Sequence, residues 1–466
     1  MLGSELTARQ TLSKRQARLM VGGSCIGVLL LLLAPLATVT AGIGLATLMY
    51  LATLMYRLLI FRAALGAPEA VVVDDLEARA IPTLQLPAYT VLVPAYREPE
   101  VIAGLLASLS QLDYPAHLLD IKLLLEADDQ ETLAAVLQAG PNENVEVLRV
   151  LPSEPRTKPK ACNVGLARAR GMFVTIYDAE DQPDPLQLRR AVAAFSRLPP
   201  EVACLQAKLS YHNAEQNLLT RWFTAEYALW FGHLLPGLIK LGAPLPLGGT
   251  SNHFRRQTLV RVGGWDPFNV TEDADLGVRL HRLGFRTGVL ESITLEEANS
   301  DFVNWTKQRS RWYKGYLQTW LVHMRHPRLL WQQLGLKGFI GFNLFVGGTP
   351  MLALLNPLFW ALTATWFLGK PSIILALFPA WLYYASLVSL ALGNFTFLYT
   401  AVVGARAAGR PSLALAALLS PGYWVMMSIA AIKAAAQLLA APTFWEKTAH
   451  GLDRPVTTAS GDHVAA

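Results

Sequence analysis

The charged residues of this chain are concentrated in its middle, and long uncharged stretches lie on either side. No charged side chain occurs in the 38 residues from Leu19 to Tyr56, or in three later runs at 338–369, 371–405 and 411–432. Each run is long enough for a membrane-spanning helix, because about 20 apolar residues cross the hydrocarbon core of a bilayer. The pattern predicts one water-soluble domain between two membrane regions.

The central part of the chain alternates buried-strand patterns with helical ones. Strands are expected where short apolar runs end at polar residues, and helices where apolar residues recur every three or four positions. The expected strands are 89–93, 121–125, 145–151 and 172–177, and the expected helices are 100–110, 130–139 and 163–169. This alternation predicts an α/β fold with a parallel sheet, in which ligands bind beyond the carboxyl ends of the strands.

Proline and glycine residues divide the uncharged stretches. Behind a basic tail of residues 1–18, Pro35 and nearby glycines predict a turn, so residues 19–62 are expected to form a transmembrane hairpin. A cleavable signal peptide is the alternative, but the apolar stretch is too long for one. Residues 336–442 are expected to hold the remaining membrane helices, about six crossings in all, before a tail of residues 443–466. Basic flanks place the soluble domain in the cytoplasm.

Composition excludes two other classes of protein. The net charge is +6, but the basic residues form no stripe with interleaved aromatic residues, so a nucleic-acid partner is not expected. The three cysteines lack the paired spacing of a disulfide framework or a zinc site.

Three acids follow the last of these strands directly. Asp178, Glu180 and Asp181 stand where carboxylates can bind a divalent cation that also holds a diphosphate, because Mg²⁺ uses one or two carboxylates together with phosphate oxygens. The alternative is that these acids cap the helix expected near Pro185.

A second acidic motif opens another expected helix. Thr271, Glu272 and Asp273 form a helix start in which a capping box is the local alternative. A transfer to a hydroxyl group requires a carboxylate that accepts its proton. Asp273 is the candidate general base.

A third motif combines an amide, a guanidinium and an indole on neighbouring faces of a helix. Gln308, Arg311 and Trp312 suit a leaving diphosphate and a flat sugar ring. The alternative is an amphipathic interfacial helix, with its aromatic rings at headgroup level and Arg309, Arg311 and Lys314 on lipid phosphates. The two readings are compatible.

These ordered motifs resemble those of the family 2 membrane glycosyltransferases, which include bacterial cellulose, hyaluronan and chitin synthases. The resemblance covers about residues 85–330 by motif and the rest by layout. It implies a cytoplasmic GT-A-like (Rossmann-type) domain over residues 70–300, inserted between transmembrane helices, and interfacial helices over residues 301–335. It also implies Mg²⁺ or Mn²⁺ as cofactor.

The resemblance assigns roles to residues of this sequence. Asp273 is the implied catalytic base with Glu272 beside it, and the metal ligands are Asp178 and either Glu180, where the family has aspartate, or the adjacent Asp181. The implied donor-binding residues are Pro94, Tyr96, Glu98, Asp128, Lys158 or Lys160, Gln308 and Arg311. The implied acceptor-binding residues are Trp312, Gly249, Thr250 and Ser251. Residues 443–448 are loosely similar to a gating loop of cellulose synthases.

The expected function is processive transfer of sugar from a nucleotide-diphosphate sugar, first of all a UDP-sugar, to a growing polysaccharide. The resemblance implies inversion at the anomeric carbon, extrusion through a bacterial inner membrane and room for an additional export subunit. Transfer of a single sugar to a lipid acceptor is the second reading. A non-catalytic membrane channel or scaffold subunit is the third.

Overall fold

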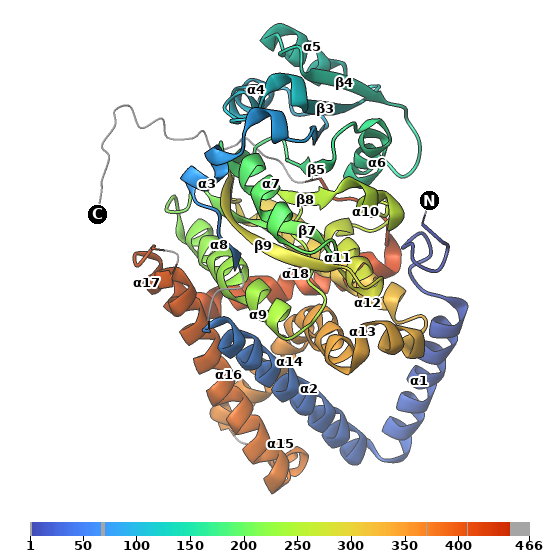
Figure 1. Cartoon of the computed structure of the whole chain (residues 1–466). Helices are drawn as coiled ribbons and strands as arrows, with labels where there is room; N and C mark the ends of the chain where they lie inside the picture. Colours follow the sequence, from blue (N-terminus) through green and yellow to red (C-terminus); the bar gives the residue numbers. More distant parts are fainter. Residues whose placement is uncertain (1, 67–69, 370, 408, 448–466) are drawn as a thin grey trace.

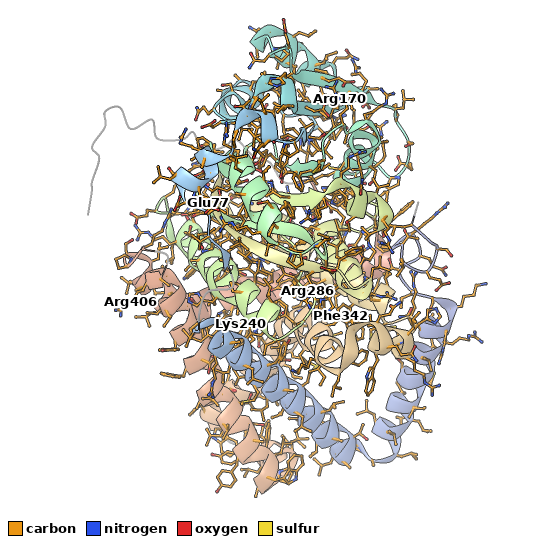
Figure 2. All side chains as sticks on the ribbon, in the orientation of Figure 1. Glu77, Arg170, Lys240, Arg286, Phe342 and Arg406 are labelled. Carbon is orange, nitrogen blue, oxygen red and sulfur yellow. The ribbon has the colours of Figure 1, made fainter. Side chains whose placement is uncertain are left out.

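The computed structural model describes residues 2–66, 70–369, 371–407 and 409–447. Figure 1 shows a sheet with its covering helices at one end of the molecule and a layer of long helices at the other. The side chains labelled Lys240 and Arg406 lie at the level where the two parts meet (Figure 2), each in the last turn of its helix. The sheet and the helical layer therefore correspond to the polar and apolar parts of the sequence.

The sheet has nine strands within the described residues, in the order β1-β9-β7-β8-β5-β2-β3-β4, with β6 paired to β9. The strands β2 to β5 run parallel, and β8 is antiparallel to both of its neighbours. The bounds are β1 Ala70–Val71, β2 Tyr89–Ala95, β3 Leu119–Glu126, β4 Val145–Val150, β5 Phe173–Ile176, β6 Gln182–Pro183, β7 Val202–Tyr211, β8 Asn252–Arg255 and β9 Arg286–Glu296.

The predicted parallel α/β unit is confirmed. The strands β2 and β3 are apolar along most of their length because helices cover both faces, and Val91, Leu92 and Val93 are fully buried. Expected strands and helices fall on observed ones to within two residues, except that α6 begins at Lys158, five residues before the expected start. The helices of this part are α3 Asp75–Ala80, α4 Ile102–Ser110, α5 Gln130–Ala139, α6 Lys158–Arg168, α7 Gln187–Arg197, α10 Arg256–Arg261 and α11 Glu272–Arg282, with 3₁₀ turns η1 Thr83–Gln85 and η2 Ala116–Leu118.

Among the described residues, five helices are long and apolar enough to cross a membrane, against the six expected. The difference arises because residues 327–369 form one helical path, within which the backbone turns at Gly335 (φ 65°) and Pro357 is accommodated. The elements are α1 Lys14–Leu33, α2 Pro35–Ala64, α13 Pro327–Gly341, the π-helical η4 Phe342–Gly347, α14 Gly348–Gly369, α15 Ser372–Leu377, α16 Ala380–Ala407, α17 Leu413–Leu418 and α18 Ser420–Ala440.

Helices α1 and α2 follow each other with only Ala34 between them, and they diverge from that point (Figure 1). Pro35 occupies the first turn of α2, where its missing N–H costs no hydrogen bond. Helix α1 buries no residue against the protein, so its leucine-rich surface is available to lipid.

Two segments connect the sheet to the helical layer. Helix α8 Leu218–Leu229 continues through the π-helical η3 Trp230–Leu234 into α9 Leu235–Lys240, and α12 spans Phe302–His323. Helix α12 carries the third motif and is largely enclosed, since Trp305 is fully buried and packs against Tyr423 of α18. The motif is therefore held between the sheet and the membrane helices.

Candidate active site

A cavity of about 520 Å³ lies at the carboxyl ends of β2, β3 and β5 and continues between the long helices. Its lining on the sheet side comes from the ends of these strands and from α6, α11 and α12. Its lining on the helical side comes from α2, α14, α16 and α18. All three sequence motifs contribute to its wall, including Asp178, Asp273 and Arg311.

The expected donor-binding residues divide into two groups. Pro94, Tyr96, Glu98 and Lys158 line the cavity, whereas Asp128 and Lys160 do not. Asp128 is paired at 2.6 Å with Arg156, a lining residue that sequence analysis missed.

The two lysines at the start of α6 have different partners. Lys158 donates to the carboxylate of Asp178 and, at 2.8 Å, to the carbonyl of Gly249. Lys160 is paired with Glu126 at 3.2 Å and also donates to the Leu151 and Ser153 carbonyls. Of the two, the structure brings only Lys158 to the acidic motif.

The acidic loop after β5 also divides. Asp178 and Glu180 line the cavity, but Asp181 is 2% exposed and lies behind the loop. Asp181 accepts hydrogen bonds from the Asp178 N–H at 2.7 Å and from the Thr250 hydroxyl. Burial and the charge of Asp178 raise its pKa well above the ordinary value. These contacts hold the loop and give no support to Asp181 as the second metal ligand.

A further carboxylate reaches this region from the far end of the chain. Glu296, at the end of β9, lines the cavity, and burial followed by the charges of Asp181 and Asp178 raises its pKa. Sequence analysis missed Glu296, although an acid at the end of a strand was the available signal.

The donor set fits a divalent cation that shares its ligands with a diphosphate. Within the described ranges, no group of three or more His, Cys, Asp or Glu side chains is placed to hold a metal ion alone. Asp178 and Glu180 nevertheless face the same cavity with Glu296 nearby, and like charges so placed are stabilised by a cation. Two carboxylates plus phosphate oxygens are the ligands that Mg²⁺ prefers.

The second motif stands at the first turn of α11. Thr271 precedes the helix without a side-chain capping bond, and its hydroxyl has no partner among the described residues, so the capping-box alternative is wrong. Glu272 is buried and Asp273 is half-buried, and both line the cavity. The Asp273 carboxylate accepts a 2.7 Å hydrogen bond from the Ala274 N–H.

Burial controls the protonation of this acid pair. It raises the pKa of Asp273 to about 6 against the lowering effect of that hydrogen bond and of the Lys158 charge. Burial, followed by the charge of Asp273, raises the pKa of Glu272 to about 8. At neutral pH Asp273 is therefore the ionised member of the pair, as a general base requires.

The third motif lies on α12 opposite the acids. Gln308, Arg311 and Trp312 all line the cavity. The Arg311 guanidinium interacts electrostatically with Glu272, Asp178 and Asp273, and it stacks on the ring of Trp445 with 4.7 Å to the centroid. A positive charge therefore faces the acidic end of the cavity.

The side chain of Arg309, which the interfacial alternative assigns to lipid phosphates, packs on the ring of Trp312 instead. Arg309 lies over the Trp312 ring at 4.7 Å and is bound to Glu226 of α8 by two hydrogen bonds of 2.8 and 2.5 Å. The alternative role of Arg309 is therefore wrong. The ion pair fixes the tryptophan instead, and Tyr227 packs on the same ring.

Only part of the expected acceptor segment reaches the cavity. Gly249 lines it, and a Cβ at this position would lie 3.4 Å from the Asp273 carboxylate. Thr250 and Ser251 are buried behind it, where Ser251 donates to Thr294 at 2.7 Å. These two residues support the strand, and Gly249 keeps room beside the candidate base.

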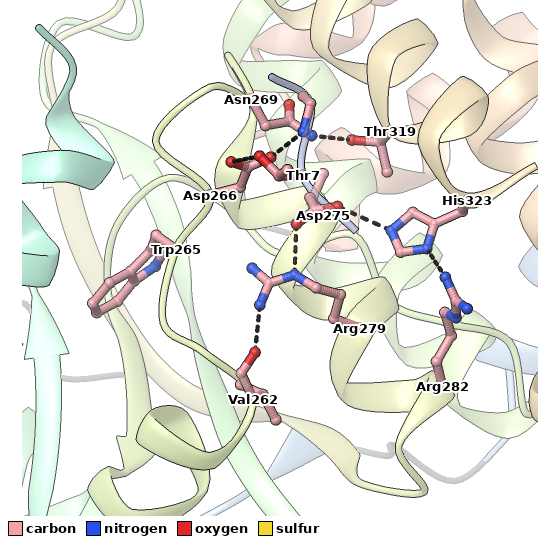
Figure 3. Close-up of polar contacts among 12 residues, drawn as sticks. Thr7, Val262, Trp265, Asp266, Asn269, Asp275, Arg279, Arg282, Thr319 and His323 are labelled. Carbon is pink, nitrogen blue, oxygen red and sulfur yellow. Dashed lines mark hydrogen bonds and ion pairs between the residues drawn. The ribbon is translucent and has the colours of Figure 1, made fainter. Parts of the chain in front are cut away.

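Figure 3 shows the buried network that fixes α11 against α12. Asp275 is bound by Arg279 at 2.7 Å and by His323 at 2.9 Å. Burial alone would raise the pKa of Asp275, but Arg279 and His323 outweigh it and hold the pKa below its ordinary value. The preceding loop is held at Asp266, which accepts hydrogen bonds from Thr7 and Ala8 of the N-terminal tail.

The C-terminal segment lies across the donor side of the cavity. Trp445 and Lys447 belong to the lining, and Lys447 donates to the Tyr96 carbonyl at 2.5 Å. Lys314 of α12 donates to the Phe444 carbonyl at 2.6 Å, and Lys433 of α18 pairs with Glu446 at 2.8 Å. Residues 443–447 of the segment compared with a gating loop are thus placed over the site, and residues 448–466 of the expected tail lie outside the described residues.

Comparisons with known proteins agree with this architecture. Residues 173–402 match the family described as "Glycosyl transferase family group 2". The "Probable glycosyltransferase YdaM" of Bacillus subtilis is 27% identical over 236 residues, 50% of this chain and 56% of that protein. The "Beta-monoglucosyldiacylglycerol synthase" of Synechocystis sp. is 30% identical over 246 residues, 52% of this chain and 50% of that protein. The chain spans about half the length of these curated relatives.

A solved structure shares the fold. The mannosyltransferase PcManGT from Pyrobaculum calidifontis, in complex with GDP-Man and Mn²⁺, aligns with a TM-score of 0.53 at 21% identity, over 86% of this chain and 99% of that one. The chain has a mixed α/β glycosyltransferase fold of the GT-A type, as predicted. The family 2 resemblance is confirmed at this level, and these matches do not test the narrower likeness to cellulose, hyaluronan and chitin synthases.

Proposed function

From the similarity to family 2, we propose that this protein transfers a single sugar from a nucleotide-diphosphate sugar to a lipid held among its membrane helices. The observation that carries the proposal is the course of the cavity, which joins the acids and Arg311 to four membrane helices. A donor bound at the strand ends and an acceptor from the membrane would meet beside Asp273.

The depth of the cavity favours a lipid over a polysaccharide that crosses the membrane. Within the described helices the lining ends near Tyr50, Trp360 and Asn394, about 20 Å from the sheet-facing ends of α2, α14 and α16 at 1.5 Å per residue. About half of α2 and α16 lies beyond these residues. A cavity of this depth accommodates a lipid headgroup and the upper part of the lipid's acyl chains. A second support is that two of the relatives are named as synthases of a glycosylated diacylglycerol.

The donor would lie across the ends of β2, β3 and β5. Tyr96 and Arg156 line this part of the cavity and would contact the nucleoside, and Lys158 and Arg311 would contact the diphosphate. A bound Mg²⁺ or Mn²⁺, held by Asp178 and Glu180, would neutralise charge on the leaving diphosphate. PcManGT was solved with a guanosine donor, whereas sequence analysis placed UDP-sugars first, so both classes are tested below.

The chemical step is a direct displacement. The acceptor hydroxyl oxygen forms a bond to the anomeric carbon as the bond from that carbon to the diphosphate oxygen breaks, and the hydroxyl proton passes to the Asp273 carboxylate. The configuration inverts because attack and departure occur on opposite faces. Arg311 stabilises negative charge that develops on the diphosphate, and Trp312, fixed by Arg309, supplies a flat surface for the sugar.

The orientation that accompanies this proposal is the one predicted from the basic flanks. Lys240 and Arg406 lie where the helical layer meets the sheet, which is the charge distribution expected if the sheet lies in the cytoplasm of a bacterium. Nucleotide sugars are made there, so the donor has direct access to the strand ends.

The test is an assay of purified protein in bilayer nanodiscs with Mn²⁺ or Mg²⁺ and labelled UDP- and GDP-sugars. We expect nucleoside diphosphate release from one donor and label that partitions into the organic phase. High-molecular-weight, glycosidase-sensitive label would instead support a polysaccharide synthase, with or without an export subunit. Release of nucleoside diphosphate from none of the donors would refute the proposed transfer and favour a non-catalytic role.

A further inference from the structure

We propose that Arg57 of α2 binds the phosphate of an anionic acceptor lipid. The inference rests on the proposed function and deepens it, because it names the chemical class of the acceptor. It concerns the membrane side of the cavity, where the sequence analysis assigned no binding residue.

Arg57 is a charged residue within a long apolar helix, and it lines the cavity. In the part of the chain that the structure describes, its side chain makes no hydrogen bond or ion pair, and its Nε is buried without a partner. The guanidinium rests instead on two aromatic rings, 5.1 Å from the centroid of Phe397 and 6.0 Å from that of Phe345. Its donors are therefore available to a ligand.

The nearest carboxylate that acts on Arg57 is already engaged. Glu226 interacts electrostatically with Arg57, but it accepts two hydrogen bonds from Arg309 and a third, of 2.8 Å, from Tyr423. Two other cations of the cavity have bound anions, since Arg309 is paired with Glu226 and Lys158 with Asp178. Arg57 differs from both because no described residue supplies an anion bound to it.

A guanidinium in a membrane-spanning segment is costly unless it faces a partner or a water-filled cavity. Its planar fork matches the oxygens of a phosphate better than it matches neutral groups. An arginine near a helix end can extend its side chain along the helix so that the guanidinium reaches the lipid headgroups. That behaviour does not explain an arginine whose Nε is buried and whose side chain lines the cavity.

The position of Arg57 points to a lipid as the source of that phosphate. Arg57 lies seven residues before the sheet-facing end of α2, about 10 Å along the helix axis. This is the depth of headgroups if the sheet stands at the membrane surface. Beyond it the lining combines the aromatic side chains of Tyr50, Trp360 and Phe397 with the polar Asn356 and Asn394.

The site also lies within reach of the proposed reaction. Tyr316 of α12 interacts electrostatically with both Asp273 and Arg57, and all three residues line the same cavity. A phospholipid whose phosphate binds Arg57 could direct a headgroup hydroxyl toward Asp273. The acceptor class is therefore a glycerophospholipid with a hydroxyl on its headgroup.

The test compares two lipids that differ in the phosphate. Native mass spectrometry of the purified full-length protein in detergent would measure binding of phosphatidylglycerol and of diacylglycerol with the same acyl chains. The variants are R57Q, R57K and, as the matched control, R62Q, which removes the same charge from an exposed position of the same helix. Soluble glycerol 3-phosphate serves as a competitor without chains.

We expect wild type and R62Q to prefer phosphatidylglycerol by about tenfold, R57K to retain part of that preference and R57Q to lose it. An unchanged preference in R57Q, or no preference in wild type, would overturn the site. Equal competition by glycerol 3-phosphate would overturn the lipid as source. Thermal unfolding and transfer of labelled sugar to lipid are measured in parallel. An unfolding temperature of R57Q equal to that of R62Q shows that the fold is intact, and absence of transfer in wild type counts against the proposed function but not against the lipid site.

Discussion

Replacing Asp273 by asparagine should abolish most activity and, at the same time, leave the fold as stable as before or more stable. Burial raises the pKa of this carboxyl from its ordinary value of 3.8 to about 6. Each tenfold change in an acid dissociation constant corresponds to about 1.4 kcal/mol, so the ionised form is disfavoured in the folded state by at most about 3 kcal/mol. The base is thus held at a cost in stability.

The sign follows from the direction of the shift. Above pH 6 the carboxyl is ionised in both the folded and the unfolded protein, so the full penalty applies at pH 7. An amide removes that penalty and can still accept the hydrogen bond from the Ala274 N–H. We expect D273N to unfold with a free energy 0 to about 3 kcal/mol higher than wild type, and to lose a factor of about 10² to 10⁴ in turnover.

The adjacent acid provides the matched control. Glu272 is buried and its pKa is raised to about 8, so it is mainly protonated at pH 7 and glutamine reproduces its neutral form. E272Q should therefore retain turnover within about tenfold. Nucleoside diphosphate release gives activity, and thermal unfolding in detergent gives stability. Full activity in D273N, or equal losses in both variants, would refute the assignment of Asp273 as base.

Three further predictions follow from neighbouring contacts. D178N should raise the Mn²⁺ concentration needed for half-maximal donor turnover at least tenfold, whereas D181N should mainly lower thermal stability; the reverse pattern would assign the metal to Asp181. D275N should lower the free energy of unfolding by about 3 kcal/mol at pH 7, because it breaks a buried ion pair. Since the pKa of Asp275 is depressed in the folded protein, this difference in free energy should shrink as the pH falls below about 4. No loss of stability at pH 7 would contradict the network of Figure 3. W445A should raise KM for the donor several-fold with little change in thermal stability, because Trp445 stacks on Arg311 over the donor side, and an unchanged KM would contradict that placement.

The parallel half of the fold was predictable because burial on both faces gives β2 and β3 apolar runs, Val91 to Val93 and Leu123 to Leu125. Strand β8 was not predicted, since it places Asn252 and His253 in the middle of the sheet. Its His253 is satisfied by a 2.7 Å hydrogen bond with Tyr89 from another strand. A polar strand of four residues gives no apolar pattern, and the partner that makes it stable lies 164 residues away.

The candidate site was predictable as a set of motifs but not residue by residue. Lys158 and Lys160 stand two positions apart at a helix start and so point in different directions, and only packing decides which faces the cavity. Glu296 lies 118 residues from Asp178 along the chain and approaches it through the order of strands in the sheet. Arg57 marked an end of the first apolar stretch in the sequence, whereas its exposure to the cavity depends on how α2 packs against α14 and α16.

The central proposal is that one sugar is added to one lipid beside Asp273. It is tested most directly by the mass of the product formed by wild-type protein in nanodiscs with excess donor. A lipid heavier by one sugar residue, with no further additions over time and no such product from D273N, is the predicted result. A ladder of products that lengthens with time would contradict the account and restore the processive polysaccharide synthase.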